Sequence, residues 1–300
     1  MKKLAFSLLL TVAGLSCLTL SGCAQRSGAA ALTQKADAGR TTLTFDVGEF
    51  DALSAKTTVR VVYTPGEGPV RVTGEVDSRW ADRLEVKVED GELCARLRGD
   101  NRDGDKTKEA EAVVYVTGPA VGRMEAVSLG SIEATRPVAA DRLELRAASM
   151  GKIVMPDFDG TALCLDAASM GSIETGAVRC DDLSVDAASM GKVRLSAAVK
   201  AGRLSIDAAS MGQVDLPGDV RAETASLSVA SMAQAEMEGK LRADRLSVDV
   251  ASSGKLYFGE LDCQKIEGSV ATTGELRAAS TKSDRRDVSV RSSAKVDWGD

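Results

Sequence analysis

The chain has 300 residues, of which 44% are hydrophobic and 27% are charged, with a formal net charge of -6. This composition is typical of a folded, core-forming protein, and the acidic balance disfavours binding to nucleic-acid phosphates. The sequence contains no histidine, which excludes Ser-His-Asp and Cys-His catalysis, histidine-ligated zinc and a histidine pH switch. Aromatic residues make up only 3%, too few for a platform that stacks on bases or sugars. We therefore expect no nucleic-acid partner.

Residues 1–22 are typical of an export signal. Lys2 and Lys3 precede an apolar stretch, residues 4–20, that is too short for a permanent membrane span. Residues 20–23, Leu-Ser-Gly-Cys, resemble the lipobox of bacterial lipoproteins. That resemblance implies cleavage before Cys23, lipid modification of its thiol and attachment to a membrane; an ordinary secretory signal is the alternative. Ala24, in place of an aspartate, favours the outer membrane. Residues 23–40 have no periodic apolar face and predict a flexible tether.

The second half of the chain is a repeat. The tripeptide Ser-Met-Gly recurs at residues 149–151, 169–171, 189–191 and 210–212. An earlier copy, Ser-Leu-Gly, lies at 128–130, and degenerate copies begin at residues 231, 252, 272 and 292. A spacing of 20–21 residues is typical of one coil of a solenoid.

Apolar residues within each repeat recur with a period of two. In one repeat Ile153 pairs with Met155, Phe158 with Gly160 and Leu163 with Leu165. Three alternating segments predict three half-buried strands per coil, whereas a stack of alanine-rich helices is disfavoured by this spacing and by the glycines. We therefore predict an all-β fold, with a right-handed parallel β-helix over residues 121–300. We expect Trp298 to close its C-terminal end.

Residues 41–120 are less regular and predict a β-rich N-terminal cap. Strands are expected at 57–64, 70–76 and 112–117, because each segment is rich in β-branched residues. Residues 84–97 predict a hairpin around Asp90-Gly91, and residues 98–109 predict a polar loop.

Several motifs together resemble a known family. They are Phe-Asp-Ala-Leu at 50–53, the strand Val-Arg-Val-Val at 59–62, the Asp-Gly turn at 90–91 and the repeated corners of small residues and glycine. This pattern, from about residue 50 to the C-terminus, is similar to the auto-transporter adhesin head-GIN family. Members are mostly exported or lipid-anchored β-helices, and the resemblance implies no catalytic residues. Many members have Gly-Ser-Gly at the corner where this chain has Ser-Met-Gly.

One position of the repeat is occupied by methionine in successive coils: Met150, Met170, Met190, Met211 and Met232. Stacked thioethers are suitable ligands for Cu(I), but the interpretation we favour is an apolar stripe that contacts another protein. A relic of recent repeat duplication is the alternative.

Asp166, Asp186 and Asp207 form an outward row that resumes at Asp249 after Ser228. Stacked carboxylates repel one another, and either a calcium ion or the nearby Lys152 and Lys192 could relieve that repulsion. The interpretation we favour is a solvated face without a bound ion.

The cysteines show no CxxC pair, so we expect no redox or metal site among them. Cys180 and Cys263 share a small inward column four coils apart, too far apart for a disulfide, which predicts buried free thiols. Cys94 lies in the predicted hairpin and Cys164 at an outward position.

These features predict a non-enzymatic lipoprotein of the cell envelope, attached to the outer membrane at Cys23 and facing the periplasm or the outside. We expect no cofactor, and an envelope protein or a polysaccharide as partner. The alternatives are a carbohydrate-active β-helix enzyme and a purely structural envelope protein. Near-constant coil length leaves no loop insertion to enclose a cleft, which disfavours the enzyme.

Overall fold

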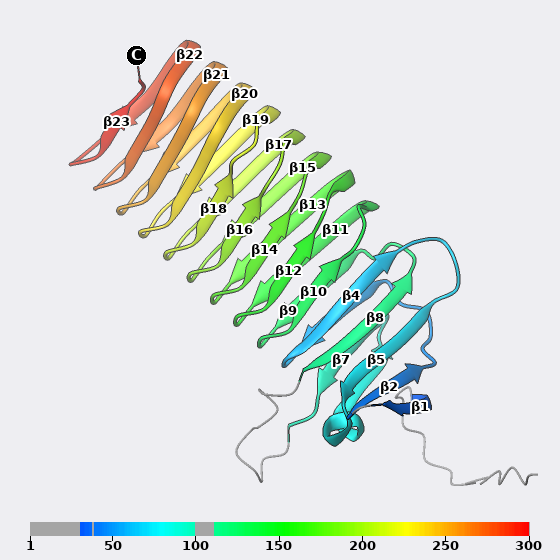
Figure 1. Ribbon diagram of the computed structural model, residues 1–300. Coiled ribbons are helices and arrows are strands. Elements are labelled where there is room, and N and C mark those ends of the chain that lie inside the picture. Colours follow the sequence, from blue (N-terminus) through cyan, green and yellow to red (C-terminus); the bar gives the residue numbers. More distant parts are fainter. Residues whose placement is uncertain (1–30, 38, 100–110, 300) are drawn as a thin grey trace, which may run out of the picture.

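The computed structural model describes residues 31–37, 39–99 and 111–299. Within these ranges every regular element is a strand except the 3-10 helix η1 (Ser78–Arg83), and the strands stack into a long series of coils (Figure 1). The parallel β-helix predicted from the repeat is therefore confirmed. No helix in the described part of the chain has the length and apolar character needed to span a membrane. The predicted signal and Cys23 lie outside the described residues.

Each middle coil consists of a short strand and a long strand. The short strands are β10 (Ser131–Ala134), β12 (Lys152–Met155), β14 (Ser172–Thr175), β16 (Lys192–Leu195) and β18 (Gln213–Leu216). The long strands are β11 (Val138–Ala148), β13 (Phe158–Ala168), β15 (Val178–Ala187), β17 (Val199–Ala208) and β19 (Val220–Val229). In the last coils the two merge into β20 (Gln234–Val250), β21 (Lys255–Val270) and β22 (Glu275–Val290), and β23 (Lys295–Asp297) ends the chain.

The three predicted segments per coil are present, although two of them lie on one long strand. In β15, Val178 and Cys180 are buried; two unburied residues follow, and burial resumes at Leu183 and Val185. This shift in phase marks a bend that does not interrupt the strand. The short strand provides the third segment of the coil.

Parallel pairing places equivalent residues of successive coils in columns. Leu163 aligns with Leu183 and Leu183 with Leu204, and all three are at most 2% exposed. These columns form one continuous core, because each coil buries its apolar face only against its neighbours. Trp298 packs against the core at the last coil, as the sequence predicts.

The N-terminal region contains the elements expected from the sequence and several more. Its strands are β1 (Ala31–Asp37), β2 (Arg40–Phe45), β3 (Ala52–Lys56), β4 (Val59–Pro65), β5 (Arg71–Asp77), β6 (Leu84–Glu89), β7 (Glu92–Leu97), β8 (Ala112–Gly118) and β9 (Arg123–Val127). The hairpin β6–β7 and strands β4, β5 and β8 match the predicted segments closely. Strands β2 and β5 pair antiparallel, as do β5 and β8, so this end of the molecule departs from the parallel pattern.

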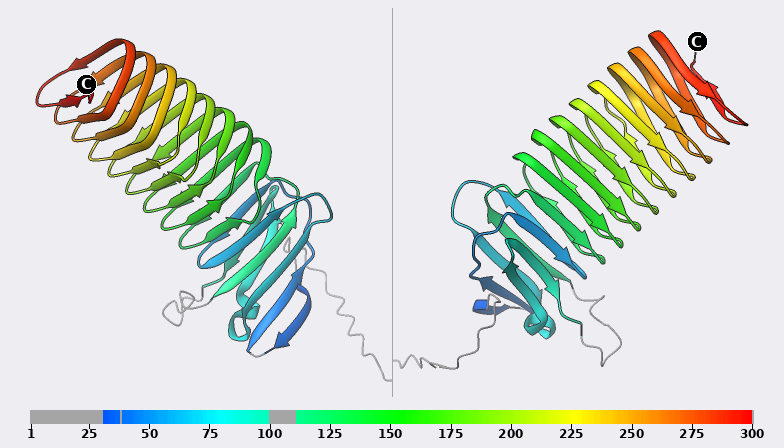
Figure 2. Two further views of the ribbon diagram at one scale, coloured as in Figure 1. Left: turned by 45° about the horizontal axis from the view of Figure 1, so that its top comes forward. Right: turned by 180° about the vertical axis from the view of Figure 1, so that it is seen from behind.

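Strand pairing continues across residue 120, where the predicted cap ends and the predicted repeat begins. Strand β3 pairs in parallel with both β7 and β9, and β4 pairs in parallel with both β8 and β10. The segment from β3 to β4 is therefore a coil that lies between β7–β8 and β9–β10. The cap and the repeat form continuous sheets for this reason, as two further views show (Figure 2).

The predicted tether, residues 23–40, requires correction. Residues 31–37 form β1, which pairs antiparallel with β2. An edge strand such as β2 exposes unpaired backbone groups, and a neighbouring segment gains hydrogen bonds by pairing with it even without a periodic apolar face. Any flexible tether is therefore shorter than the sequence suggests.

Candidate functional site

The Ser-Met-Gly tripeptide forms a tight turn between the long and the short strands. Ser169 and Met170 both have positive φ, 50° and 69°, and the Gly171 amide donates to the Ala168 carbonyl at 2.8 Å. Two successive left-handed residues closed by this hydrogen bond are the geometry of a type I′ turn. Glycine and asparagine favour that geometry, so serine and methionine adopt it at a conformational cost.

The turns of successive coils are hydrogen-bonded to one another. The Met170 amide donates to the Ser189 carbonyl at 3.3 Å, and the Met190 amide donates to the Ser210 carbonyl at the same distance. The glycine that follows lies against the preceding coil, because a Cβ at Gly191 would be 1.9 Å from the Ala167 carbonyl oxygen. The inner side of the turn is therefore sterically closed, and the methionine side chain points outward.

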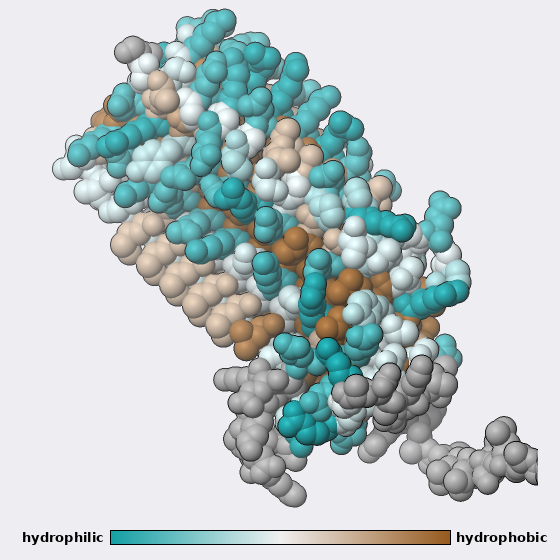
Figure 3. Space-filling model, in the orientation of Figure 1, coloured by the Kyte–Doolittle hydropathy of each residue, from teal (hydrophilic) through white to brown (hydrophobic). Residues whose placement is uncertain are grey.

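The outward side chains form an exposed apolar line that we name the methionine ridge: Leu129, Met150, Met170, Met190, Met211 and Met232. Their exposed fractions run from 41% at Leu129 to 65% at Met232. Outside the ridge, Tyr115 and Val290 are the exposed large hydrophobic residues of the described part of the chain. Apolar side chains follow one edge of the stacked coils in Figure 3. The structure thus brings together the methionines that the sequence placed in one row.

A row of aspartates lies on the long strands just before the ridge. The register aligns Asp166 with Asp186 and Asp186 with Asp207. Arg146 heads this row and pairs with Asp166, with 3.3 Å between Nη2 and Oδ2. Desolvation, and then the charges of Asp207 and Asp166, raise the pKa of Asp186.

The two lysines considered for relief of this row do not pair with it. Lys152 and Lys192 lie on the short strands beyond the turn, and neither makes an ion pair with a described residue. The arginine of the preceding coil is nearer because it stands in the same column as Asp166.

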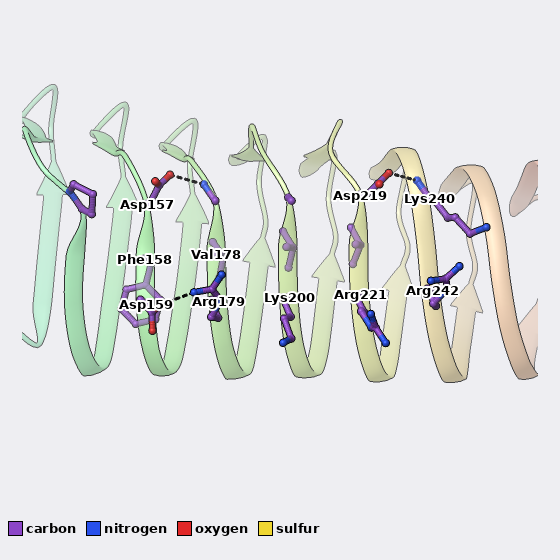
Figure 4. Close-up of a pocket in the computed structure, with 15 residues that line it drawn as sticks. Asp157, Phe158, Asp159, Val178, Arg179, Lys200, Asp219, Arg221, Lys240 and Arg242 are labelled. Atoms are coloured by element: carbon purple, nitrogen blue, oxygen red, sulfur yellow. Dashed lines mark hydrogen bonds and ion pairs between the residues drawn. The ribbon is translucent and has the colours of Figure 1, made fainter.

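The sequence analysis missed a second charged row, which we name the basic row: Arg179, Lys200, Arg221 and Arg242. These residues are exposed and line an open groove of about 600 Å³ (Figure 4). Each stands directly after the first buried residue of its face, as Arg179 follows Val178. The signal was available in the sequence as a cation at one outward position of four successive repeats.

Acidic side chains gather at one further place. The carboxylates of Asp215, Glu236 and Glu238 have oxygens within 4.8 Å of one another, and Asp215 also pairs with Arg194 at 2.5 Å. No motif in the sequence singles out these three residues, because they lie in adjacent coils at positions that other coils fill differently.

The described cysteines are free thiols. Cys180 and Cys263 are buried in the small inward column, linked through Ala201, Ala222 and Ala243, as predicted. Burial raises the pKa of both thiols to about 11, which keeps them protonated and unreactive at neutral pH. Cys164 is partly exposed at its outward position.

Comparison with known proteins assigns the described solenoid to one protein family. The family model described as "putative auto-transporter adhesin, head GIN domain" matches residues 49–221 and 222–300. A "putative lipid binding protein" from Parabacteroides distasonis has a similar crystal structure, with a TM-score of 0.57 and 15% identity, over 87% of this chain and 97% of that chain. A "putative adhesin" from Parabacteroides merdae aligns with a TM-score of 0.51 and 13% identity, over 87% and 96%. The search of curated proteins found no match.

Proposed function

Because this chain belongs to the head GIN domain family of auto-transporter adhesins, we propose that it is a non-enzymatic binding protein of the cell envelope whose methionine ridge contacts a partner protein. The observation that carries this proposal is the ridge itself. Its apolar side chains are exposed along one straight edge of a rigid solenoid, at turn positions whose backbone favours glycine.

The chemistry of the ridge suits protein binding. Methionine is unbranched and polarisable, so a row of such side chains adapts to apolar surfaces of different shape. Covering one half-exposed methionine contributes roughly 1 kcal/mol, so five contribute about 5 kcal/mol. Association itself costs at least about 4 kcal/mol, so the ridge alone supports weak binding. Affinity would then increase with many copies on one surface.

The ridge is tested by replacing three methionines with serine. The chain already has Ser253 at the equivalent turn position with φ of 67°, so Met170→Ser, Met190→Ser and Met211→Ser together should preserve the fold. Beads coated with the wild-type protein should adhere to isolated envelopes, and beads coated with the triple variant should lose most of that adherence.

The matched control removes exposed apolar side chains elsewhere. Tyr115→Ser with Val290→Ser changes the two large hydrophobic residues that are exposed outside the ridge in the described part of the chain. This double variant should adhere like the wild type. Equal adherence by all three proteins would refute the ridge as the binding surface.

Anchoring is the second part of the proposal, and it depends on the lipobox-like segment at residues 20–23. The signal would direct export and be cleaved before Cys23, and the lipid on Cys23 would then hold the solenoid at the outer membrane, with several acyl chains giving lasting attachment. The variant Cys23→Ser should move from the membrane fraction to the soluble fraction and lose incorporation of labelled palmitate. Retention in the membrane fraction would contradict the anchor.

A further inference from the structure

The basic row lies on a different face of the coil from the methionine ridge and has its own unbalanced charge. Its four cations stand on β15, β17, β19 and β20, in direct register. Adjacent strands are about 4.8 Å apart, so the row extends over roughly 14 Å. Like charges directly opposite one another on neighbouring strands are destabilising.

The ends of the row are neutralised but its middle is not. Arg179 pairs with Asp159, with 3.2 Å between Nη1 and Oδ2, and Arg242 pairs with Asp262, with 3.1 Å between Nη2 and Oδ2. Lys200 and Arg221 make no ion pair with any described residue. The structure therefore leaves two adjacent, exposed cations without a partner among the described residues.

Carboxylates bound the row on both sides without reaching it. Asp219 accepts a hydrogen bond from the Lys240 amide at 3.0 Å, as Asp157 does from the Ala177 amide at 2.8 Å (Figure 4). Beyond the other side of the row lie exposed acids that also line the adjoining groove: Asp181, Glu223 and Asp244. Lys240, on the Asp219 side, is paired with Glu260, so the unpaired charges of Lys200 and Arg221 lie between Asp219 on one side and these three acids on the other.

This charge pattern favours an extended ligand over a flat one. A flat anionic membrane would meet the acids on both sides together with the cations, whereas a single extended chain can follow the row. Single-stranded nucleic acid is disfavoured because such sites also need exposed aromatic side chains, and Phe158 in the groove wall is buried. The strand spacing of about 4.8 Å is close to the length of one sugar unit in an extended polysaccharide.

We propose that the basic row binds an extended acidic polysaccharide, with carboxylates or sulfates opposite Lys200 and Arg221. Each charge contact is weak at an exposed site, about 1 kcal/mol or less, so binding requires a polymer that occupies several positions of the row. The proposal does not depend on the methionine ridge, because the two sites use different residues on different faces.

The test measures binding of the full protein to polygalacturonate, which carries one carboxylate per sugar, at low ionic strength. Lys200→Ala with Arg221→Ala should weaken binding about tenfold, since two charge contacts are lost. The control Lys152→Ala with Lys192→Ala removes the same charge from exposed lysines of the short strands and should change the affinity less than about twofold. Neutral dextran should not bind.

Three results would overturn the proposal. One is undetectable binding of the wild type to polygalacturonate, and another is equal weakening by the two double variants, which would indicate only general attraction. The third is binding to anionic phosphatidylglycerol vesicles that shows the same dependence on Lys200 and Arg221, which would make the ligand a membrane surface. Thermal unfolding with and without the polymer provides a second readout, because a ligand raises the midpoint only of the variant that binds it.

Discussion

The turns of the middle coils and the turns of the last coils differ mainly in one outward residue. Met190 has φ of 69°, and Ser253, at the equivalent place, has φ of 67°. The preceding serines also agree, with φ of 51° at Ser189 and 49° at Ser252. The same backbone turn therefore forms with methionine or with serine. The backbone does not require methionine, and its repetition in the middle coils needs another cause.

In the last turns the backbone conformation itself changes at this outward position. Thr272 keeps a positive φ of 61°, but its neighbour Thr273 does not adopt a left-handed conformation. Ser293, at the same position of the final turn, likewise does not adopt that conformation, so a β-branched side chain does not by itself account for the difference. Ser253 and Thr273 instead join their hydroxyl groups at 2.7 Å. Turns with polar side chains are thus hydrogen-bonded to each other through those side chains, whereas the methionine side chains leave an apolar edge without such bonds.

The first prediction concerns the inner side of the turn, where both sets of coils are constrained. The variant Gly191→Val places a side chain 1.9 Å from the Ala167 carbonyl oxygen, so the free energy of unfolding should fall by about 3 kcal/mol or more. Urea unfolding measures this loss. The control Gly66→Val adds the same atoms in open space and should change stability little.

Ala233 makes this first prediction more specific. It occupies the glycine position of one turn, and its amide lies 3.1 Å from the Ala230 carbonyl, against 2.8 Å for the Gly191 amide and Ala188. The turn evidently opens slightly to admit one methyl group, so Gly191→Ala should cost less than Gly191→Val. Equal stability of Gly191→Val and the wild type would show that the turn is not closely packed.

Much of the fold could be predicted because stacking translates a sequence repeat directly into columns. A period of two within a period of 20–21 residues fixes which side chains point inward, and Leu183 and Cys180 are buried accordingly. The order of the first coils could not be predicted. Strands β3 and β4 precede β7 and β8 in the chain but lie between them and the repeat, and only long-range pairing determines that arrangement.

The candidate sites were predictable to different degrees. The methionine ridge follows from the regular spacing of the repeat, because five successive copies have methionine, and the copy before them leucine, at the same turn position. The basic row is visible in the sequence as a cation at one position of four repeats, but the sequence does not show which of these cations lack an acidic partner. Arg203 shows the contrast, since it pairs with Asp182 at 2.7 Å although it is, like Lys200, an exposed cation on β17. Pairing across coils is a property of the folded structure.

The second prediction tests whether methionine is placed in the turn at the expense of stability. A non-glycine residue in the left-handed region costs roughly 1 kcal/mol, and part of that is offset because glycine gains freedom in the unfolded chain. Met190→Gly should therefore raise the free energy of unfolding by about 0.5 kcal/mol. Ser226→Gly, at an exposed position within β19, is the control and should lower it.

If Met190→Gly destabilises the protein, the conclusion that the fold does not require methionine at these turns would be wrong. It would mean that the methionine side chains stabilise one another along the edge, so that the ridge is part of the fold rather than a surface held available for a partner. Stabilisation, together with lost adherence of the triple serine variant, would indicate that binding and stability favour different residues at this turn.

The third prediction concerns the aspartate row beside the methionine turns, where Ser228 already interrupts the charges. The raised pKa of Asp186 means that the folded protein holds the proton more tightly than the unfolded chain. Stability should consequently fall as pH rises from the ordinary carboxyl pKa of about 4 through the raised value, and the loss should persist at neutral pH. Asp186→Ser should raise the unfolding midpoint by about 1 °C at pH 7.5. Near pH 3.5 that difference should disappear.

Two further measurements separate simple repulsion from a bound cation in this row. Asp166→Ser removes the nearer of the two acidic partners of Arg146, so it should not stabilise the protein at pH 7.5 even though it removes the same charge as Asp186→Ser. If calcium is the counter-ion, adding it should raise the midpoint of the wild type, and Asp186→Ser should abolish that rise. A midpoint that does not respond to calcium, combined with a more stable Asp186→Ser variant, would mean that these carboxylates repel one another without an ion between them. Ser228, which occupies the next position of the aspartate row, would then be a residue that avoids this repulsion.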